Sequence, residues 1–225
     1  LYFHGGGYVL GSVDTHHNFV SLMSVELGIK IYSLEYRLAP ENKFPDALND
    51  ANEAYQWLKN KGYADKQIML CGDSAGGHLA ASLTNHLDSM EKELPYSQIL
   101  IYPMVCPSLN FESMELFKEN YLLTKASMEF FRDQYLENNE LTQDPLVSPL
   151  FADDLSGHPP AVVVTAGFDP LRDEGDQYAQ ALRQANVEIY HRTHDSYIHG
   201  FVNMMLVDGV DYALKRICDD FKKIF

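Results

Sequence analysis

The sequence has little cysteine and little positive charge. Its three cysteines, Cys71, Cys106 and Cys218, lie far apart and have neither C-x-x-C nor metal-ligand spacing, so we expect reduced thiols and no metal site. Lysine and arginine number 17 against 32 aspartate and glutamate, which gives a formal net charge of -15. Such a charge repels phosphate backbones and anionic lipid headgroups. We therefore exclude nucleic acid as a partner.

Long hydrophobic runs are also absent. No stretch approaches the roughly 20 apolar residues of a membrane-spanning helix, and no signal-peptide pattern opens the chain. Together with reduced cysteines, this favours a cytoplasmic protein. The chain starts at Leu1 rather than at methionine, and residues 1–3 read as the end of a buried strand. We therefore expect that residues upstream are missing and that any targeting signal could lie among them.

What the chain does contain is enough apolar sequence for one domain. Its 225 residues are 46% hydrophobic, which predicts a single globular domain over 1–225 with a sizeable core. Within it, 68–81 reads I-M-L-C-G-D-S-A-G-G-H-L-A-A and contains G-x-S-x-G around Ser74. The apolar run before Ser74 predicts a strand, and the alanine-rich stretch after it predicts a helix. That is the setting of a nucleophile elbow, which projects a serine hydroxyl away from its backbone.

A second glycine cluster lies near the start of the chain. His4 is followed by Gly5, Gly6 and Gly7, and three glycines after a strand allow the backbone N–H groups to converge on one point. An H-G-G-G loop upstream of a nucleophile elbow is the esterase arrangement of an oxyanion hole. We therefore predict that these glycines and Ala75 supply the oxyanion hole.

Between these motifs, strand and helix patterns alternate. This alternation predicts a parallel sheet with helices on both faces, that is, an α/β fold. The expected strands are 30–36, 68–71, 98–102, 161–166 and 187–192, and the expected helices are 16–27, 45–61, 75–86, 176–185 and 208–225. Asp173 and Glu174 are interpreted as first-turn residues that the helix dipole favours.

The pattern changes over 104–149. This segment contains one amphipathic helix, predicted at 127–136, among loops rich in aromatic residues. We interpret it as a lid-like insertion whose aromatic side chains mostly pack as core. Tyr121 and Leu122 are predicted to line a substrate pocket. Tyr8, which follows the glycines, and Asp73, which precedes Ser74, complete the predicted substrate-binding set.

Three residues at the ends of predicted strands form a candidate catalytic set. Ser74, Asp169 and His199 occur in the chain order of the α/β-hydrolase triad. His199 would take the Ser74 proton, and Asp169 would orient the imidazole. His199 is preferred among nine histidines, with His16, His17, His191 and His194 as the rivals near these motifs, because it follows the last strand and precedes a glycine. Asp195 is the rival acid, placed in the same loop as His199.

Five motifs together resemble one family. They are H-G-G-G at 4–7, Y-R-L-A-P-E at 36–41, G-D-S-A-G-G at 72–77, D-P-L-R-D-E at 169–174 and H-G-F at 199–201. Their order is similar to that of the hormone-sensitive-lipase family of α/β-hydrolase esterases. The resemblance implies an ester hydrolase without cofactor that acts on short to medium acyl esters, and structural roles for Arg37 and Glu41. In that family two further strands and part of a helical cap precede the H-G-G-G loop, so those parts are expected to be missing here.

We expect a small-molecule ester as substrate and a serine acyl-enzyme as intermediate. An amidase or deacetylase on the same three residues is an alternative, because amides and esters share the tetrahedral intermediate. A small-molecule receptor without catalysis is a further alternative, since one fold carries many functions. The predicted last strand, 187–192, is expected at a sheet edge and could pair with its copy in a homodimer.

Overall fold

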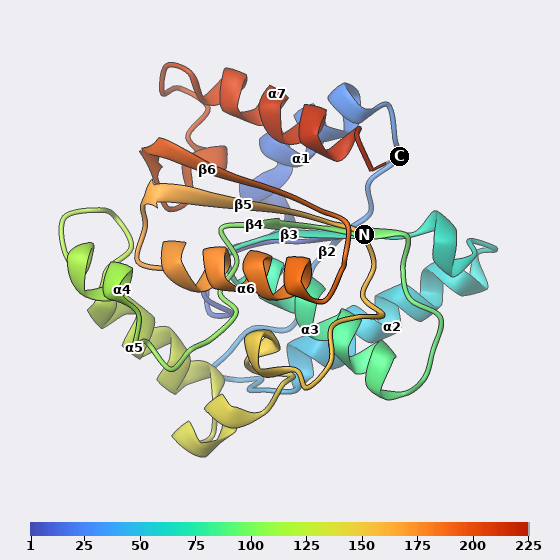
Figure 1. Ribbon diagram of the computed structural model, residues 1–225, viewed down its shortest axis with the longest axis horizontal. Helices are drawn as coiled ribbons and strands as arrows, with labels where there is room; N and C mark the ends of the chain where they lie inside the picture. Colours follow the sequence, from blue (N-terminus) through green and yellow to red (C-terminus); the bar gives the residue numbers. More distant parts are fainter. Residues whose placement is uncertain (225) are drawn as a thin grey trace.

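A six-stranded parallel sheet forms the centre of the molecule, which is described over residues 1–224 in a computed structural model (Figure 1). The spatial order of the strands is β2-β1-β3-β4-β5-β6, and all neighbours run parallel. This confirms the predicted α/β class. The strands are β1 (Tyr2–Phe3), β2 (Ser33–Leu34), β3 (Met69–Asp73), β4 (Ser97–Ile101), β5 (Ala161–Phe168) and β6 (Ile189–Ile198).

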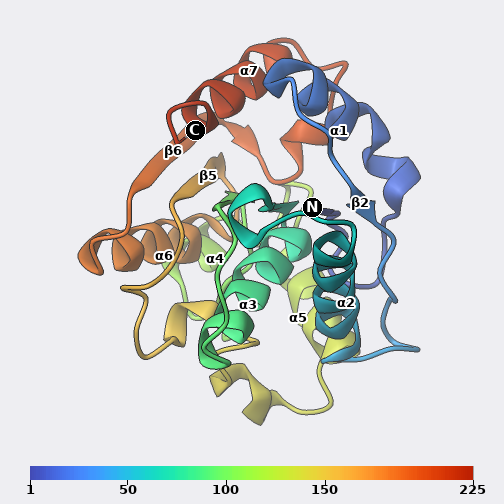
Figure 2. The same ribbon diagram turned by 90° about the vertical axis from the view of Figure 1, so that its right-hand side faces the viewer.

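Helices cover both faces of this sheet. Seen along the strands, α1 and α7 form one layer, and α2, α3 and α6 form the layer on the opposite face (Figure 2). The bounds of these helices are α1 (Val13–Leu27), α2 (Asp46–Asn60), α3 (Ala75–Ser89), α6 (Arg172–Gln184) and α7 (Val210–Phe221). Parallel strands need such crossovers, because the chain must return to the same end of the sheet before each new strand.

Strand β5 shows how the two helical layers pack against the sheet. Its residues 161–166 are all fully buried, and its side chains alternate between two hydrophobic clusters. Val163 packs into the cluster with α2, α3 and α6, whereas Val162 and Val164 pack into the cluster with α1 and α7. A strand buried on both faces is mostly apolar, which is why A-V-V-V-T-A shows no polar alternation. Its one polar residue, Thr165, donates its hydroxyl to Asp176 of α6 at 2.9 Å.

The first part of the insertion between β4 and β5 lies at the left of Figure 1, beyond the carboxyl ends of the strands, and its last part, drawn in yellow, lies below α3 and α6. The insertion contains a helix at the predicted place, α5 (Lys125–Tyr135), which starts two residues early because Thr124 and Ser127 form a capping box. The sequence analysis missed its shorter elements, α4 (Glu112–Leu116), η2 (Asn139–Gln143) and η3 (Pro149–Phe151). Two further 3-10 turns lie elsewhere, η1 (Asp65–Gln67) and η4 (Phe201–Asn203).

Several predicted boundaries were wrong. The strand expected at 30–36 is reduced to β2, because its neighbour β1 offers only two residues for pairing. The last strand starts at Ile189 and continues to Ile198, so it is longer than 187–192. Helix α6 starts four residues before the predicted 176–185. Helix α7 ends at Phe221, and residue 225 of the predicted helix lies outside the described residues.

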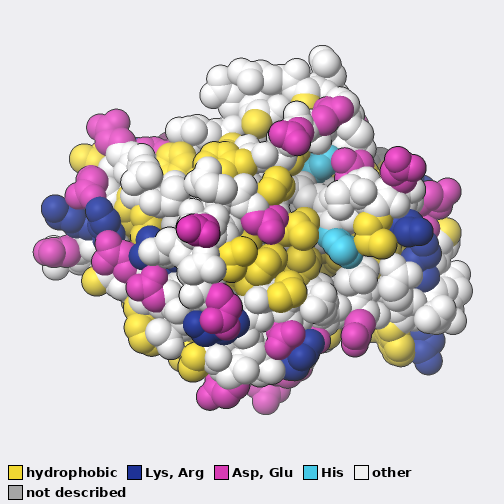
Figure 3. All heavy atoms as spheres, turned by 90° about the horizontal axis from the view of Figure 1, so that it is seen from below, with side chains coloured by type: hydrophobic (Ala, Val, Ile, Leu, Met, Phe, Trp, Pro, Cys, Tyr) yellow, Lys and Arg dark blue, Asp and Glu magenta, His cyan; other side chains and the backbone are white. Residues whose placement is uncertain are grey.

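Strand β6 occupies the predicted edge of the sheet. Dimerisation through it stays a prediction. On the face seen from below, basic side chains occur in small groups beside acidic ones, around an apolar area (Figure 3). Within residues 1–224, no helix has the length and apolar character to cross a bilayer.

Candidate active site

Ser74, Asp169 and His199 meet at the carboxyl edge of the sheet. The Nε2 atom of His199 lies 2.9 Å from the Ser74 Oγ atom, and its Nδ1 atom lies 2.7 Å from Asp169 Oδ2. Asp169 is fully buried and His199 nearly so. With Nδ1 held as the donor to the carboxylate, Nε2 is left to accept the serine proton. The arrangement can therefore activate the hydroxyl as a nucleophile.

Local backbone geometry places Ser74 between β3 and α3. Its φ of 55° and ψ of -120° are strained for a residue with a side chain, as in a nucleophile elbow. A Cβ atom on Gly72 would lie 2.2 Å from the Gly76 backbone, and one on Gly76 would lie 2.0 Å from the Phe3 carbonyl oxygen. The two glycines of G-x-S-x-G are thus required by close backbone packing.

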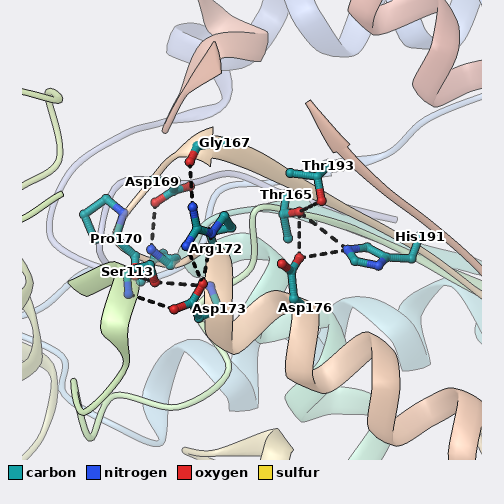
Figure 4. Close-up of polar contacts among 11 residues, drawn as sticks. Ser113, Thr165, Gly167, Asp169, Pro170, Arg172, Asp173, Asp176, His191 and Thr193 are labelled. Carbon is teal, nitrogen blue, oxygen red and sulfur yellow. Dashed lines mark hydrogen bonds and ion pairs between the residues drawn. The ribbon is translucent and has the colours of Figure 1, made fainter. Parts of the chain in front are cut away.

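Hydrogen bonds within its own turn hold Asp169 in place (Figure 4). The backbone N–H of Leu171 donates to Asp169 Oδ1 at 2.8 Å, which leaves Oδ2 for His199. The Arg172 guanidinium donates to the carbonyl oxygen of Gly167 at 3.2 Å and pairs with the Asp173 carboxylate at 2.9 Å. The turn after β5 is therefore held by the Leu171 N–H and by the Arg172 side chain.

The insertion is attached to the same turn through Ser113 of α4. The Ser113 hydroxyl donates to the carbonyl oxygen of Pro170, and its N–H donates to Asp173 Oδ2, both at 2.8 Å (Figure 4). Arg172 also lies over the Phe117 ring, 5.1 Å from its centroid. The lid-like segment and the acid-bearing turn therefore form one connected unit.

Two of the rival histidines, His191 and His194, and the rival acid Asp195 do not line the cavity next to Ser74. His191 in β6 contacts Asp176 of α6 at 2.9 Å and faces the Thr165 hydroxyl of β5 (Figure 4). Burial lowers the pKa of His194 to about 4, with Arg192 as a smaller cause. The placement of Asp195 in the loop of His199 was wrong, because Asp195 is an exposed residue within β6.

The H-G-G-G loop faces the elbow, but its three glycines are not equivalent. The N–H of Gly5 donates to Asp73 Oδ1 at 2.8 Å, so it is not aimed at an oxyanion. The prediction of Gly5 as a donor in the oxyanion hole disagrees with this contact. Gly6 and Gly7 line the cavity next to Ser74, and within residues 1–224 their N–H groups have no hydrogen-bond acceptor. Ala75 is the first residue of α3, where a helical N–H lacks an intrahelical acceptor.

Tyr36 supports this loop from the Y-R-L-A-P-E segment. Its ring stacks on His4 with centroids 4.2 Å apart, and its hydroxyl donates to the His4 carbonyl oxygen at 2.7 Å. The next residue, Arg37, forms a pair of short contacts with Asp50 of α2. These contacts agree with the structural role expected for Arg37, whereas Glu41 is exposed.

A cavity of about 410 Å³ opens beside Ser74 and has a mostly apolar wall. Tyr8, Asp73 and Leu122 lie in this wall as predicted. Tyr121 does not line the cavity but stacks on Phe168, with ring centroids 5.6 Å apart. The apolar part of the wall comes chiefly from the insertion, through Leu123, Met128, Phe131, Tyr135 and Leu136.

The sequence analysis missed some of these wall residues. Phe131 and Tyr135 follow one helical face of α5, a pattern that indicates core as readily as a pocket. Tyr135 stacks on Tyr8 with ring centroids 3.7 Å apart, which joins the insertion to the residue after the glycines. His16 is a cavity residue as well, but the sequence analysis treated it only as a rival histidine.

Comparison with known proteins agrees with this geometry. A family model described as alpha/beta hydrolase fold matches residues 1–203. The chain belongs to the α/β-hydrolase family. Within it, the relatives place the chain in the hormone-sensitive-lipase-like group, as the motifs indicated.

Named relatives of this α/β hydrolase include the carboxylic ester hydrolase LipN of Mycobacterium tuberculosis, 39% identical over 93% of the chain. The ethyl acetate hydrolase of Pseudomonas putida is 34% identical over 97% of the chain. The chain spans 58% of the length of LipN and 71% of that of the ethyl acetate hydrolase. A solved structure of a hyperthermophilic esterase from Pyrobaculum calidifontis matches 99% of the chain and 75% of its own, with a TM-score of 0.94 and 37% identity.

Metal ligands are not grouped in the part of the α/β hydrolase that the structure describes. Residues 1–224 contain no group of three or more His, Cys, Asp or Glu side chains placed to hold a metal ion. Cys71, Cys106 and Cys218 are buried free cysteines. Cys71 lies in β3 with little exposure, as expected for a small strand hydrophobe.

Glu174 is a buried carboxyl group close to Asp169 of the candidate catalytic set. It lies in the first turn of α6 as predicted, but it is fully buried rather than at the helix surface. Its Oε1 atom accepts hydrogen bonds from the N–H groups of Val105 and Cys106. Burial raises the pKa of Glu174 to about 8 against those two hydrogen bonds. At pH values between 4.5 and about 8, Glu174 is therefore protonated in the folded α/β hydrolase and ionised in the unfolded chain.

This difference predicts a pH dependence of stability. Between the ordinary pKa of 4.5 and the folded value of about 8, the folded state binds one proton more than the unfolded state at this residue. Stability must then fall as pH rises through this window. The Tm of the wild type should therefore fall between pH 5 and pH 8. In Glu174→Gln, a neutral isostere, we expect this fall in Tm to be smaller by on the order of 5 to 10 °C. Calorimetry measures this, with Glu119→Gln on the surface as control, and equal slopes for all three proteins would contradict it.

Proposed function

We propose that this chain is the catalytic part of a carboxylic ester hydrolase that acts on short to medium acyl esters. The observation that carries the proposal is the linked set of two contacts, Ser74 Oγ to His199 Nε2 at 2.9 Å and His199 Nδ1 to Asp169 Oδ2 at 2.7 Å. The set lies at an apolar cavity of about 410 Å³, within the usual size range of small-molecule sites. Relatives named as ester hydrolases support the reaction class.

In the proposed mechanism, Ser74 attacks the ester carbonyl while His199 takes the hydroxyl proton. The negative charge that develops on the carbonyl oxygen is held by the N–H groups of Ala75, Gly6 and Gly7. Ser74 precedes the first turn of α3, so the positive end of that helix also faces this oxygen. These donors are fixed by the fold before substrate arrives, which is the condition for strong oxyanion stabilisation.

The alcohol leaves with the proton from His199, and the acyl group stays on Ser74. Water then attacks the acyl carbonyl while the same imidazole takes one of its protons. The bond between the acyl group and Ser74 Oγ breaks, His199 returns the proton to Ser74, and the acid leaves. Asp169 stabilises the positive imidazole in both steps without taking its proton. These steps need only side chains, backbone amides and water.

We also propose the segment 104–149 as a lid of this single domain. It supplies the apolar wall around the substrate and is attached to the Asp169 turn through Ser113. An apolar wall of limited volume suits an acyl chain better than a charged group, because an unpaired charge would lose its hydration there.

Matched substrates test the reaction class. The full-length protein is assayed on a p-nitrophenyl acetate and on the corresponding acetanilide, and on p-nitrophenyl esters of increasing acyl length. We expect turnover of the esters far above that of the anilide, with kcat/KM declining once the acyl chain exceeds the cavity. A faster reaction on the anilide would instead identify an amidase. Failure of a fluorophosphonate probe to label Ser74 in the folded protein would point to a receptor without catalysis.

A further inference from the structure

His16 is a buried histidine in the cavity wall, at the side of the oxyanion loop. It lies in α1, is 7% exposed, and lines the same cavity as Gly6, Gly7 and Ser74. The mechanism above does not use it. Its two ring nitrogens face different groups, and these groups define which protons the ring carries.

The Nε2 atom of His16 faces the Asp73 carboxylate, 3.5 Å from Oδ1. Asp73 is 3% exposed, and the same Oδ1 atom accepts hydrogen bonds from the Tyr2 hydroxyl at 2.5 Å and from the Gly5 N–H at 2.8 Å. A carboxylate surrounded by donors is ionised and accepts only. A nitrogen that faces it must therefore carry a proton.

The Nδ1 atom of His16 faces two oxygens of its own helix start. One is the Ser12 carbonyl oxygen at 3.3 Å, which can only accept. The other is the Thr15 hydroxyl at 2.9 Å, whose single proton goes to the same Ser12 carbonyl at 2.9 Å. With that proton used, the hydroxyl oxygen is an acceptor toward His16. Nδ1 must then carry a proton as well.

We propose that His16 is an imidazolium in the resting enzyme and that its charge neutralises Asp73 beside the oxyanion hole. It is a positioning residue, because it acts through Asp73 and the Gly5 N–H rather than on the substrate. The inference rests on the proposed ester hydrolysis only for its kinetic consequence.

The need for such a charge follows from the position of Asp73. This carboxylate precedes the nucleophile and is bound to the oxyanion loop, so its charge lies close to the place where a second negative charge develops during the reaction. Like charges at a buried position raise each other's energy. A cation that pairs with Asp73 removes this penalty while the carboxylate continues to hold Gly5 in place.

The titratable groups around His16 agree with this assignment. Burial lowers the pKa of His16, but the contact with Asp73 outweighs it, and the net pKa is raised. Burial raises the pKa of Asp73, but His16, Tyr2 and Gly5 together lower it below its ordinary value. His4 of the oxyanion loop lies with its ring centroid 5.5 Å from that of His16, and burial lowers the pKa of His4, so it remains neutral beside the cation. The Tyr2 ring of β1 is a further titratable neighbour, 6.4 Å away between centroids.

Nuclear magnetic resonance of the histidine nitrogens tests the proton assignment independently of activity. In the full-length protein labelled with heavy nitrogen, the two ring nitrogens of His16 should both have shifts typical of imidazolium at neutral pH. His16→Gln identifies the signals by their loss. A neutral ring with a proton on Nε2 alone would overturn the proposal, because Thr15 would then donate to Nδ1.

A double-mutant cycle tests the kinetic role. We expect His16→Gln to lower kcat roughly ten- to a hundredfold with little change in KM, less than the loss of an oxyanion donor itself. In an Asp73→Asn background, which keeps the acceptor for Gly5 but removes the charge, the same substitution should cost less than about threefold. The alkaline decline of kcat that His16 deprotonation causes should disappear in His16→Gln.

Equal losses from His16→Gln in both backgrounds would refute charge neutralisation, as would an unchanged pH profile. Fluorophosphonate labelling of Ser74 in the same variants separates the two claims. If Ser74 is still labelled and His16→Gln lowers kcat equally in both backgrounds, the role of His16 is rejected and the proposed ester hydrolase is retained. Absence of labelling in the wild type would instead reject the hydrolase.

Discussion

Replacement of Ser74 by alanine is expected to abolish the burst of p-nitrophenol from a short p-nitrophenyl ester and to lower kcat by about 10⁴- to 10⁶-fold. The burst reports formation of the acyl-enzyme, and the Ser74 Oγ atom is the only nucleophile that His199 contacts within the described residues 1–224. Rapid-mixing absorbance measures the burst amplitude against the enzyme concentration.

The same experiment needs a serine control and a test of folding. Ser156→Ala changes an exposed serine in a loop and should keep both the burst and the rate. Because alanine fits the elbow at least as well as serine, circular dichroism and Tm of Ser74→Ala should match those of the wild type closely. An undiminished burst in a folded Ser74→Ala protein would eliminate the serine mechanism.

Replacement of Asp169 by asparagine is expected to lower kcat on the order of 10⁴-fold, with a much smaller effect on KM. Asparagine fills the same space, but its amide can present a donor to His199 Nδ1 and so favour the wrong tautomer. The imidazole would then direct a proton toward Ser74 rather than accept one. Steady-state kinetics at neutral pH measures the loss.

Asp195→Asn provides the matched control for this second experiment. Asp195 is close to His199 in sequence, carries the same charge and is exposed in β6. Its loss should change kcat by less than about threefold, as for ordinary surface substitutions. If Asp195→Asn were the damaging change and Asp169→Asn the mild one, the assignment of the acid would be wrong.

The sequence alone was sufficient for the fold class and for bringing the three candidate residues to one edge. That inference was reliable because five of the six residues at 161–166 are apolar and because the carboxyl ends of parallel strands share an edge. The limits of β2 and β6 could not be read in the same way. They depend on how many residues the neighbouring strand offers for pairing, which is a property of the assembled sheet.

Within the site, the sequence could not assign individual donors. Gly5, Gly6 and Gly7 are identical as letters, and only the contact between the Gly5 N–H and Asp73 distinguishes the first from the other two. The position of His16 in the cavity wall could not be predicted for a similar reason, because its partner Asp73 is far away in the chain. The complete burial of Glu174 could not be predicted either, since an acidic residue in a first helical turn is usually exposed.

The attachment of α4 to the acid-bearing turn has a consequence for how substrates are distinguished. Ser113 is fully buried, and its two hydrogen bonds to Pro170 and Asp173 connect the insertion, which supplies the proposed acyl-binding wall, with the turn that carries Asp169. A bulky acyl group that pushes this wall outward would also tilt Asp169. Selectivity for chain length would then appear in the turnover rate as well as in affinity, so that a poor fit slows the chemistry itself.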